Sequence, residues 1–345
     1  MTARVTLRSY LDRSAAQTLQ AASISAVIAA IAAGGIELAA LIAAGPLVGI
    51  TGAEDGTNSD GDAQKDIDVA ADNIMMRVLH ETPVAAVLSE EQALPITFDA
   101  DAPLCVAIDP LDGSANLENN ISVGTIFSIR PRGRDVLSTF FEPGTAQRAA
   151  GFVVYGPQTS LVLALDGHVD IFILDRRTQE FVLVTPGVRI AADTPEFAIN
   201  ASNRRHWTAA VRTYIDECLA GTKGERGEDF NMRWIGSLVA ETFRILMRGG
   251  VFLYPADARE GYREGRLRLL YEAHPMALIM EWAGGSATTG RRRILDISAR
   301  MPHQRVPLIM GSLNGVADIS AIHEGIEPMF ENSDAPLFAR RGLFR

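Results

Sequence analysis

Cysteine and lysine are both scarce in this chain. Its 345 residues include only two cysteines, Cys105 and Cys218, and only two lysines, Lys65 and Lys223. The two cysteines cannot form a disulfide framework, and neither stands in a spacing that binds zinc. The formal net charge is −10 and no block of like charges occurs, which argues against nucleic acid as a partner. A reducing, cytoplasmic environment is therefore expected.

One long apolar run, residues 21–50, superficially resembles a signal peptide or a membrane span. Alanine dominates this run, the pair Gly34-Gly35 interrupts it, and Glu37 lies near its centre. A charged side chain at that depth in lipid would cost about 2.5–3.5 kcal/mol. We therefore predict two buried or half-buried helices, over 14–33 and 36–44, and no membrane contact.

The remaining sequence alternates helical and strand-like patterns without an internal repeat. A helix over 65–81 and buried strands over 84–88 and 104–108 are predicted to precede a large sheet between residues 123 and 184. Residues 185–196 hold two prolines and a glycine and are the best candidate for a boundary. The second half is predicted to interleave strands at 197–200, 251–254 and 306–310 with helices near 207–220, 237–248, 273–283 and 314–324. These patterns indicate an α/β or α+β fold with helices layered over sheets, in two domains over 1–190 and 191–345.

Several acidic residues occupy positions from which they could converge. Some lie in the Gly- and Asp-rich loop 46–68, which is predicted to be exposed and mobile, and others follow predicted strands, where ligands gather in layered sheets. Two carboxylates ~4 Å apart repel by about 4 kcal/mol at an effective dielectric near 20, so divalent cations would relieve such a cluster. Oxygen ligands alone favour Mg²⁺ or Mn²⁺ over zinc. The acids are Asp62, Asp68, Glu90, Glu91, Asp109, Asp112 and Glu272. Taken singly, each could equally be a solvated charge or a helix cap.

The stretch "IDPLDGSAN", residues 108–116, combines two of these acids with turn-forming residues. Its simplest interpretation is a strand that ends in an ordinary turn, with Pro110 and Gly113 making the bend. A chemical interpretation is also open. The two aspartates could hold metals, the bend at Pro110 could turn the Leu111 carbonyl inward as a further ligand, and Gly113 and Ser114 could present backbone N–H groups to a phosphate.

Six segments, in this order and spacing, resemble class I fructose-1,6-bisphosphatase over nearly the whole chain. They are "GDAQKDID", "LSEE", "DPLDGSAN", "SVGTIFSI", "GGVFLYPA" at 249–256 and "GRLRLLYEAHPMA" at 265–277. The "DPLDGS" segment is shared in looser form with inositol phosphatases, whereas the last two are specific to sugar bisphosphatases. The resemblance implies a layered αβαβα fold and hydrolysis of the 1-phosphate of fructose 1,6-bisphosphate, giving fructose 6-phosphate.

The resemblance also implies roles for individual residues at the reacting phosphate. The metal ligands, for two or more Mg²⁺ or Mn²⁺ ions, would be Glu90, Asp109, the Leu111 carbonyl, Asp112 and Glu272. Asp62 matches a loop acid that completes the site, and Asp68 with Glu91 matches the pair that orients and deprotonates the attacking water. The phosphate turn would comprise Asp112, Gly113, Ser114 and Ala115.

For the distant 6-phosphate, the resemblance implies Asn200, Tyr254 and Arg266 in one subunit and Arg233 from a neighbouring subunit, in a homotetramer. Without the family, Tyr254 would be taken for strand packing and the two arginines for exposed charge. Four positions depart from the common pattern. These are Trp234, Asn203, Ala115 and Arg266, and the last two, Ala115 and Arg266, bear on the preference for the sugar.

Alternative functions stay open at this point. The enzyme could also cleave sedoheptulose 1,7-bisphosphate, it could be an inositol or nucleotide monophosphatase, or it could be a catalytically inactive sensor of sugar phosphates. Gluconeogenesis and carbon fixation use the same chemistry. Many relatives are inhibited by AMP, but the matching positions here, 18–22 with Pro103 and Leu104, lack nearly every group that would bind the nucleotide. We therefore expect no regulation by AMP, and no thiol switch from Cys105 or Cys218.

Overall fold

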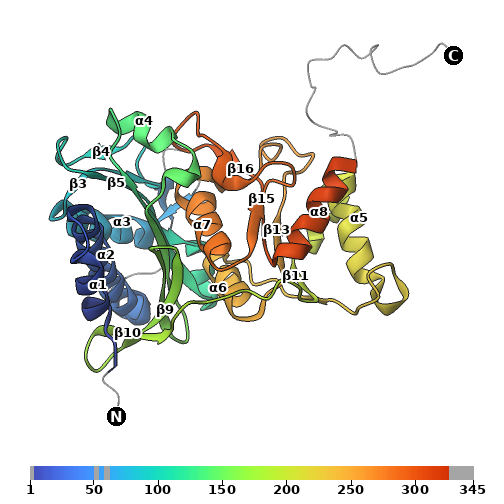
Figure 1. Ribbon diagram of the computed structural model, residues 1–345, viewed down its shortest axis with the longest axis horizontal. Coiled ribbons are helices and arrows are strands. Elements are labelled where there is room, and N and C mark those ends of the chain that lie inside the picture. Colours follow the sequence, from blue (N-terminus) through green and yellow to red (C-terminus); the bar gives the residue numbers. More distant parts are fainter. Residues whose placement is uncertain (1–3, 50–53, 58–62, 326–345) are drawn as a thin grey trace.

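The computed structural model describes residues 4–49, 54–57 and 63–325, and its elements stack in five layers (Figure 1). Helices α1, α2 and α3 form one outer layer, an eight-stranded sheet lies beneath them, and helices α6 and α7 lie between this sheet and a second sheet of five strands. Helices α5 and α8 cover the far side of the second sheet. This is the αβαβα arrangement of helices over sheets that the sequence predicted.

The eight-stranded sheet spans the first half of the chain. In spatial order its strands are β10 (Glu180–Thr185), β9 (His168–Asp175), β8 (Thr159–Leu165), β7 (Ala149–Tyr155), β6 (Val123–Pro131), β5 (Leu104–Asp112), β3 (Val84–Ser89) and β4 (Ile96–Thr97). All pairs are antiparallel except β3 with β5. Helices cover both faces, so every residue of β5 is buried. The predicted strands at 84–88 and 104–108 and the predicted sheet over 123–184 are confirmed.

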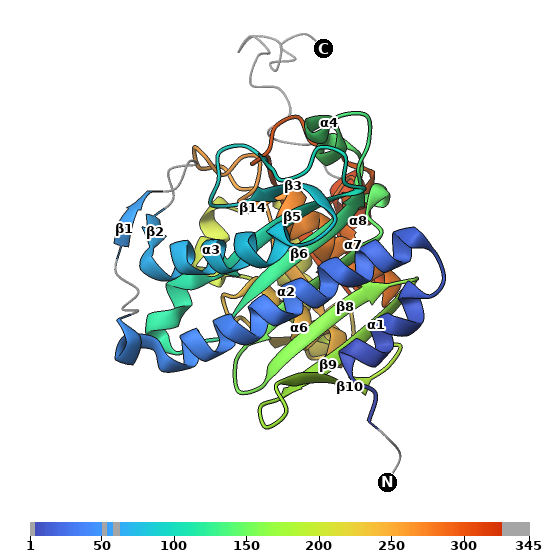
Figure 2. The same cartoon turned by 90° about the vertical axis from the view of Figure 1, so that its left-hand side faces the viewer.

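The apolar N-terminal run folds differently from the prediction. A separate helix, α1 (Leu7–Ala15), comes first, and α2 (Leu19–Ala44) is then one continuous helix that passes through Gly34 and Gly35 (Figure 2). The predicted break at this glycine pair was wrong because the glycines serve packing. A Cβ atom on Gly34 would lie 3.1 Å from the Met75 sulfur, and one on Gly35 would lie 3.3 Å from a Val153 methyl group. The two glycines therefore let α2 approach α3 and the sheet closely.

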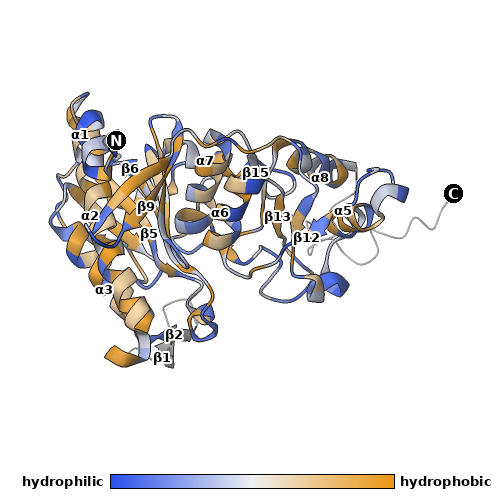
Figure 3. Cartoon of the chain, turned by 90° about the horizontal axis from the view of Figure 1, so that it is seen from below, coloured by the Kyte–Doolittle hydropathy of each residue, from blue (hydrophilic) through white to orange (hydrophobic). Residues whose placement is uncertain are grey.

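Length and composition alone would allow the helical stretch Leu19–Val48 to cross a membrane. One face of this stretch packs within the protein, while Leu19, Leu47 and Val48 at its two ends are exposed. Figure 3 shows α2 as a mainly hydrophobic helix, and Val27, Ile28 and Ile31 on it are almost fully buried in the same core as α3 and β5. Packing against α3 and the sheet accounts for the buried apolar face of α2.

The predicted helix over 65–81 is confirmed as α3 (Asp66–His80). The loop before it contains a short antiparallel pair, β1 (Glu54–Thr57) and β2 (Ala63–Lys65), which the sequence did not predict. Asp62 lies outside the described residues. A short helix, α4 (Val136–Phe141), connects β6 to β7.

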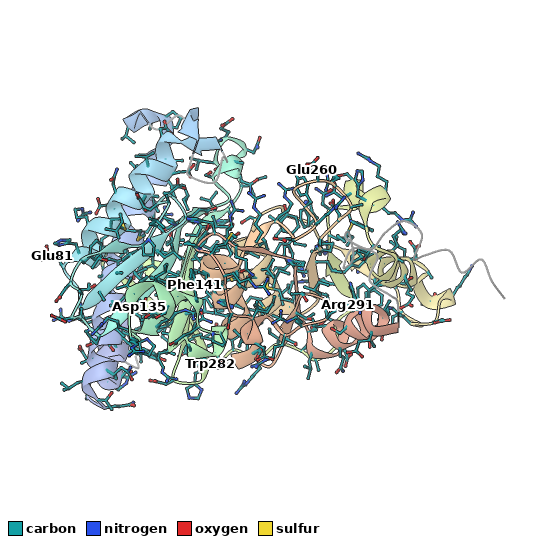
Figure 4. The ribbon with its side chains drawn as sticks, turned by 90° about the horizontal axis from the view of Figure 1, so that it is seen from above. Glu81, Asp135, Phe141, Glu260, Trp282 and Arg291 are labelled. Atoms are coloured by element: carbon teal, nitrogen blue, oxygen red, sulfur yellow. The ribbon has the colours of Figure 1, made fainter. Side chains whose placement is uncertain are left out.

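The five-stranded sheet belongs to the second half of the chain. Its order is β12 (Asn231–Met232), β11 (Glu196–Ala198), β13 (Val251–Tyr254), β17 (Leu308–Gly311) and β15 (Ser286–Thr288). Its helices are α5 (Ala209–Leu219), α6 (Leu238–Arg248), α7 (His274–Trp282) and α8 (Leu313–Gly325). The predicted strand at 306–310 is two strands, because β16 (Arg305–Val306) pairs instead with β14 (Leu267–Arg268). Figure 4 shows side chains filling the space between the layers, with Glu260 and Arg291 on the outside of this half.

Candidate active site

Three acidic side chains from the two halves of the chain meet at one point. Asp109 and Asp112 lie at the end of β5, and Glu272 lies in a π-helical turn, Leu269–Ala273, that precedes α7. One carboxylate oxygen of each lies within 4.8 Å of the others, and all three residues are buried. Single π-helical turns are rare and occur most often at functional sites. The structure thus brings together three of the acids that the sequence singled out.

The end of β5 contains a β-bulge. Asp109 pairs with Ile126 of β6 and Asp112 pairs with Gly124, so three steps along β5 match two along β6. The Leu111 N–H donates to Asp109 Oδ1 at 3.0 Å, which fixes that carboxyl group. The strand therefore continues through Pro110, where the sequence predicted a bend that ends it. A bulge re-aims side chains locally, and here it directs two aspartates to the same place.

Asp112 and Glu272 each accept a backbone hydrogen bond. The Val239 N–H, in the first turn of α6, donates to Asp112 Oδ2 at 3.1 Å, and the Arg268 N–H donates to Glu272 Oε2. The N-terminus of α6 favours a negative charge, yet burial is the larger effect and raises the pKa of Asp112 from 3.8 to about 6. Burial and the charges of Glu90 and Asp112 raise the pKa of Glu272 well above its usual range.

Glu90 joins this acidic cluster from the end of β3. Its carboxyl group lies close enough to that of Asp109 for each of the two to affect the pKa of the other. Although the residue as a whole is half-buried, desolvation of the carboxyl group raises the pKa of Glu90 to about 7. The same burial, with the charges of its acidic neighbours, raises the pKa of Asp109 well above its usual range.

The four carboxyl groups are better suited to binding a divalent cation than to lying together as carboxylates without one. Without an added positive charge, burial and mutual repulsion hold their pKa values high. An enclosed donor set of carboxylate oxygens is the type that hard ions such as Mg²⁺ and Mn²⁺ prefer. The cluster of Asp109, Asp112 and Glu272 could therefore hold a metal ion.

The structure places a cation inside this cluster that the sequence did not predict. Arg268, four residues before Glu272, is buried, and its charge lowers the pKa of both Glu90 and Glu272. Its guanidinium group also donates to the Arg266 carbonyl at 3.0 Å. The signal was present in "GRLRLLYEA", but an arginine in an apolar stretch does not by itself reveal that it will be buried among acids.

Asp68 lies beside the turn that follows β5. It occupies the first turn of α3, where Oδ2 accepts the Lys65 N–H at 2.9 Å and the Ser114 hydroxyl at 3.2 Å. Burial raises the pKa of Asp68. Gly113 adopts φ +77°, a left-handed conformation that favours glycine, and Ala115 follows Ser114 on an exposed 3₁₀ turn. Residues 113–115 therefore lie between Asp68 and the carboxylate cluster.

Glu91 is half-buried next to Glu90, whose pKa its charge raises. Its backbone N–H donates to the Ser89 hydroxyl, and that hydroxyl in turn donates to Asp72 Oδ1 at 2.6 Å. Asp72 also accepts from the Gln92 amide at 2.7 Å. Asp72 was not predicted from the sequence, although it lies one helical turn beyond Asp68 on the same face of α3. It anchors the segment that carries Glu90 and Glu91.

A second polar site lies beyond the acidic cluster, in the C-terminal half. Asn200, Asn203, Tyr254 and Arg266 line one small pocket. The Arg266 guanidinium lies over the Tyr254 ring, 5.6 Å from its centroid, and over the Tyr262 ring at 4.6 Å. The structure thus brings together three predicted ligands of the distant phosphate, Asn200, Tyr254 and Arg266.

A cavity of about 130 Å³ connects the two sites. Asp112 of the acidic cluster and Tyr254 of the second site both line it, together with Trp234 and Leu267. Trp234 stacks parallel to Phe252 with ring centroids 6.0 Å apart. Tyr254 lines both pockets, so a ligand of the size of a sugar could contact residues of both sites at once.

Arg233, the remaining predicted ligand of the 6-phosphate, lies near Glu196 instead. Within the described part of the chain it lines neither of these pockets, its side chain is half-exposed, and its Nε atom lies 3.7 Å from the buried Glu196 carboxylate. Arg244 and Arg248 also bind Glu196, at 2.9 and 2.5 Å. Arg244 also pairs with Glu241, so three arginines meet two carboxylates and one positive charge is left over among these five groups.

Comparison with known protein families gives two matches that together span most of the chain. Residues 5–186 match the family described as "Fructose-1-6-bisphosphatase, N-terminal domain", and residues 190–324 match "Fructose-1-6-bisphosphatase, C-terminal domain".

Individual relatives are similar over almost their full length. A protein of Bradyrhizobium sp. (strain ORS 278) named fructose-1,6-bisphosphatase class 1 is 68% identical over 337 residues, which is 95% of each chain. One of the same name from Bradyrhizobium diazoefficiens is 56% identical over 346 residues, covering 100% of each. Among solved structures, Leishmania major fructose-1,6-bisphosphatase in holo form has a TM-score of 0.86 at 32% identity, covering 93% of this chain and 99% of that chain.

Proposed function

Because the chain belongs to the class 1 fructose-1,6-bisphosphatase family and is a fructose-bisphosphatase, we propose that the acidic cluster is where it removes the 1-phosphate. The observation that carries this proposal is the link between two unlike sites. A buried carboxylate cluster suited to hard cations and a Tyr–Arg pocket suited to a second phosphate share one connecting cavity. A bisphosphate needs both sites, whereas a monophosphate needs only the first.

Two or more Mg²⁺ ions, with Mn²⁺ as a substitute, are the proposed cofactor. Glu90, Asp109, the Leu111 carbonyl, Asp112 and Glu272 would hold them. Bound cations supply neutralising charge to the phosphate and acidify a water molecule. Arg268 would keep the carboxylates of this cluster from separating through repulsion.

The chain's own residues would carry the proton and orient the reactants. Glu91, beside Glu90, and Asp68, beside Ser114, are the proposed pair that positions the attacking water and accepts its proton, with Asp62 completing the site. Asp72 supports the segment that carries Glu91 through the Ser89 hydroxyl. The backbone N–H groups of residues 113–115 would bind the oxygens of the 1-phosphate, since Gly113 permits the tight turn.

The sugar and the second phosphate would bind in the connecting cavity and the pocket beyond it. Tyr254 and Trp234 offer apolar walls to the sugar, while Arg266 and Asn200 offer charge and hydrogen bonds to the 6-phosphate. Positive charge at this place matters because the chain as a whole is acidic.

We further propose a cytoplasmic homotetramer built from two-domain subunits, 1–190 and 191–345. Arg233 of each subunit would reach the 6-phosphate site of a neighbour, which agrees with its exposed position outside the pocket of its own subunit. Closed symmetric assemblies are the usual form of soluble oligomers.

Phosphate release from a panel of substrates tests the proposal. We expect turnover of fructose 1,6-bisphosphate with Mg²⁺ or Mn²⁺, none after chelation, and none by folded Asp109→Asn. Sedoheptulose 1,7-bisphosphate belongs in the panel because Trp234 and Arg266 line the sugar path. Inositol and nucleotide monophosphates should be poor substrates. Full activity of metal-free Asp109→Asn, or a preference for monophosphates, would refute the assignment.

A further inference from the structure

The segment "SVGTIFSI" holds a buried hydroxyl group that packing alone does not explain. Thr125 lies in the middle of β6 and is fully buried. Its Oγ1 lies 2.8 Å from the Pro110 carbonyl oxygen, to which it donates a hydrogen bond. Pro110 is part of the bulge between Asp109 and Asp112, so the hydroxyl of Thr125 contacts the backbone that carries two of the proposed metal ligands.

A second buried hydroxyl group supports the first. The Tyr155 oxygen, on β7, lies 2.8 Å from Thr125 Oγ1. A threonine hydroxyl has one proton, and the Pro110 carbonyl, which can only accept, takes it. Tyr155 must therefore donate to Thr125. Burial raises the pKa of Tyr155, so its proton stays in place. Two hydrogen bonds thus run in one direction across three strands, from β7 through β6 to β5.

The bulge needs an outside partner at this point. Neither Pro110 nor Leu111 has a paired residue on β6. The peptide group that joins them is instead held at both ends, its carbonyl by Thr125 and its N–H by the Asp109 carboxylate. Rotation of this peptide group would break both hydrogen bonds and release the Asp109 carboxylate, beside the backbone that carries the Leu111 carbonyl. Thr125 prevents that rotation.

Helix α2, in the outer layer, covers the Tyr155 hydroxyl group. A Cβ atom on Gly35 would lie 3.4 Å from the Tyr155 hydroxyl oxygen and 3.3 Å from a Val153 methyl group. Glycine at this position therefore allows the helix backbone to cover the tyrosine hydroxyl. Tyr155 is 5% exposed, so water has little access to compete for its hydrogen bond.

We propose that Thr125 and Tyr155 are positioning residues for the metal site. Through the Pro110–Leu111 peptide group they set the spacing of the Asp109 and Asp112 carboxylates and the direction of the Leu111 carbonyl. This inference rests on the proposed role of those groups as metal ligands. Partners that orient ligands in this way typically change metal affinity by about 10–100-fold when they are removed.

Three variants and a control test the inference. Thr125→Val removes the donor at nearly constant volume, Thr125→Ser keeps it, and Tyr155→Phe removes only the second bond. Thr288→Val is the control, because the Thr288 hydroxyl in β15 likewise makes two hydrogen bonds, donating to the Arg292 carbonyl at 3.0 Å and accepting the Gly290 N–H at 3.0 Å. Each protein is checked by circular dichroism and thermal unfolding. Mn²⁺ binding is then measured directly by electron paramagnetic resonance without substrate, and kcat and KM are measured at several Mg²⁺ concentrations.

We expect Thr125→Val to bind Mn²⁺ about tenfold or more weakly and to need correspondingly more Mg²⁺ for half-maximal kcat. The KM for substrate at saturating Mg²⁺ should change little, because the 6-phosphate pocket is untouched. Thr125→Ser should restore the affinity, Tyr155→Phe should lose part of it, and Thr288→Val should bind like the wild type.

Wild-type Mn²⁺ affinity in Thr125→Val would overturn the inference. If that variant does not fold, wild-type affinity in Tyr155→Phe would do so. Asp109→Asn separates this outcome from failure of the site itself. Unchanged Mn²⁺ binding in Asp109→Asn would refute the metal site, whereas its loss there, combined with wild-type binding in the Thr125 and Tyr155 variants, would refute only the positioning role.

Discussion

Replacing Asp112 by asparagine should raise the stability of the metal-free protein and abolish its activity. Burial raises the pKa of Asp112 from 3.8 to about 6 in the folded, metal-free protein. The folded state therefore holds this proton more tightly than the unfolded chain does, and stability falls as pH rises from about 4 to 6. At 1.36 kcal/mol per pH unit, the buried carboxylate destabilises the metal-free protein at pH 7 by about 3 kcal/mol.

Asparagine removes this cost and keeps an oxygen that can accept the Val239 N–H. Without metal, Asp112→Asn should therefore unfold about 5 °C above the wild type at neutral pH, and the difference should vanish near pH 4. Mg²⁺ should raise the melting temperature of the wild type, most strongly at high pH, and have little effect on the variant. Activity of the variant should be lost.

Differential scanning fluorimetry across this pH range, with Mg²⁺ or chelator, measures these effects. Asp170→Asn is the matched control, because Asp170 is a buried carboxylate on β9 that binds Tyr10 and the Gly187 N–H outside the cluster. Its response to Mg²⁺ should equal that of the wild type. A metal-free Asp112→Asn that is less stable than the wild type at neutral pH would show that the carboxylate is satisfied without a cation, and the reasoning would fail.

Three further predictions concern proton transfer, assembly and regulation. Glu91→Gln should lower kcat by about 10²–10⁴-fold while Mn²⁺ still binds, since the residue is proposed to take a proton rather than to hold metal; unchanged kcat would contradict this. Arg233→Ala should raise KM about tenfold or more with kcat largely kept, and light scattering should show a tetramer; an active monomer with wild-type KM would speak against the shared arginine. AMP should not inhibit at subsaturating substrate, because Thr18 Oγ1 already accepts the Ala21 N–H at the start of α2; cooperative inhibition at micromolar AMP would disprove it.

The sequence predicted the elements whose patterns are local. Buried strands such as β5 are continuous apolar runs, and α3 has a clear helical period. The pair Gly34-Gly35 misled the prediction because its cause is not local. Two glycines lower the helix propensity of the segment, but their contacts with α3 and β7 outweigh that cost, and those contacts depend on residues that lie far away in the chain.

At the candidate site, too, features with a local pattern were predicted and features that depend on distant residues were not. The spacing of Asp109 and Asp112 was visible in "DPLDG", and the structure brings Glu272 to them. The buried charge of Arg268 and the support from Asp72 were not predicted, because both depend on contacts with other elements of the fold. The bulge at Pro110 also escaped prediction, since it depends on the register with β6.

A crystal structure with Mn²⁺ and fructose 6-phosphate would test the central claim most directly. We expect anomalous scattering peaks between the carboxylates of Asp109, Asp112 and Glu272, with the sugar in the cavity beside Tyr254 and its phosphate at Arg266. Peaks at some other group of residues, or a sugar phosphate bound away from the cavity that joins the two sites, would contradict the account.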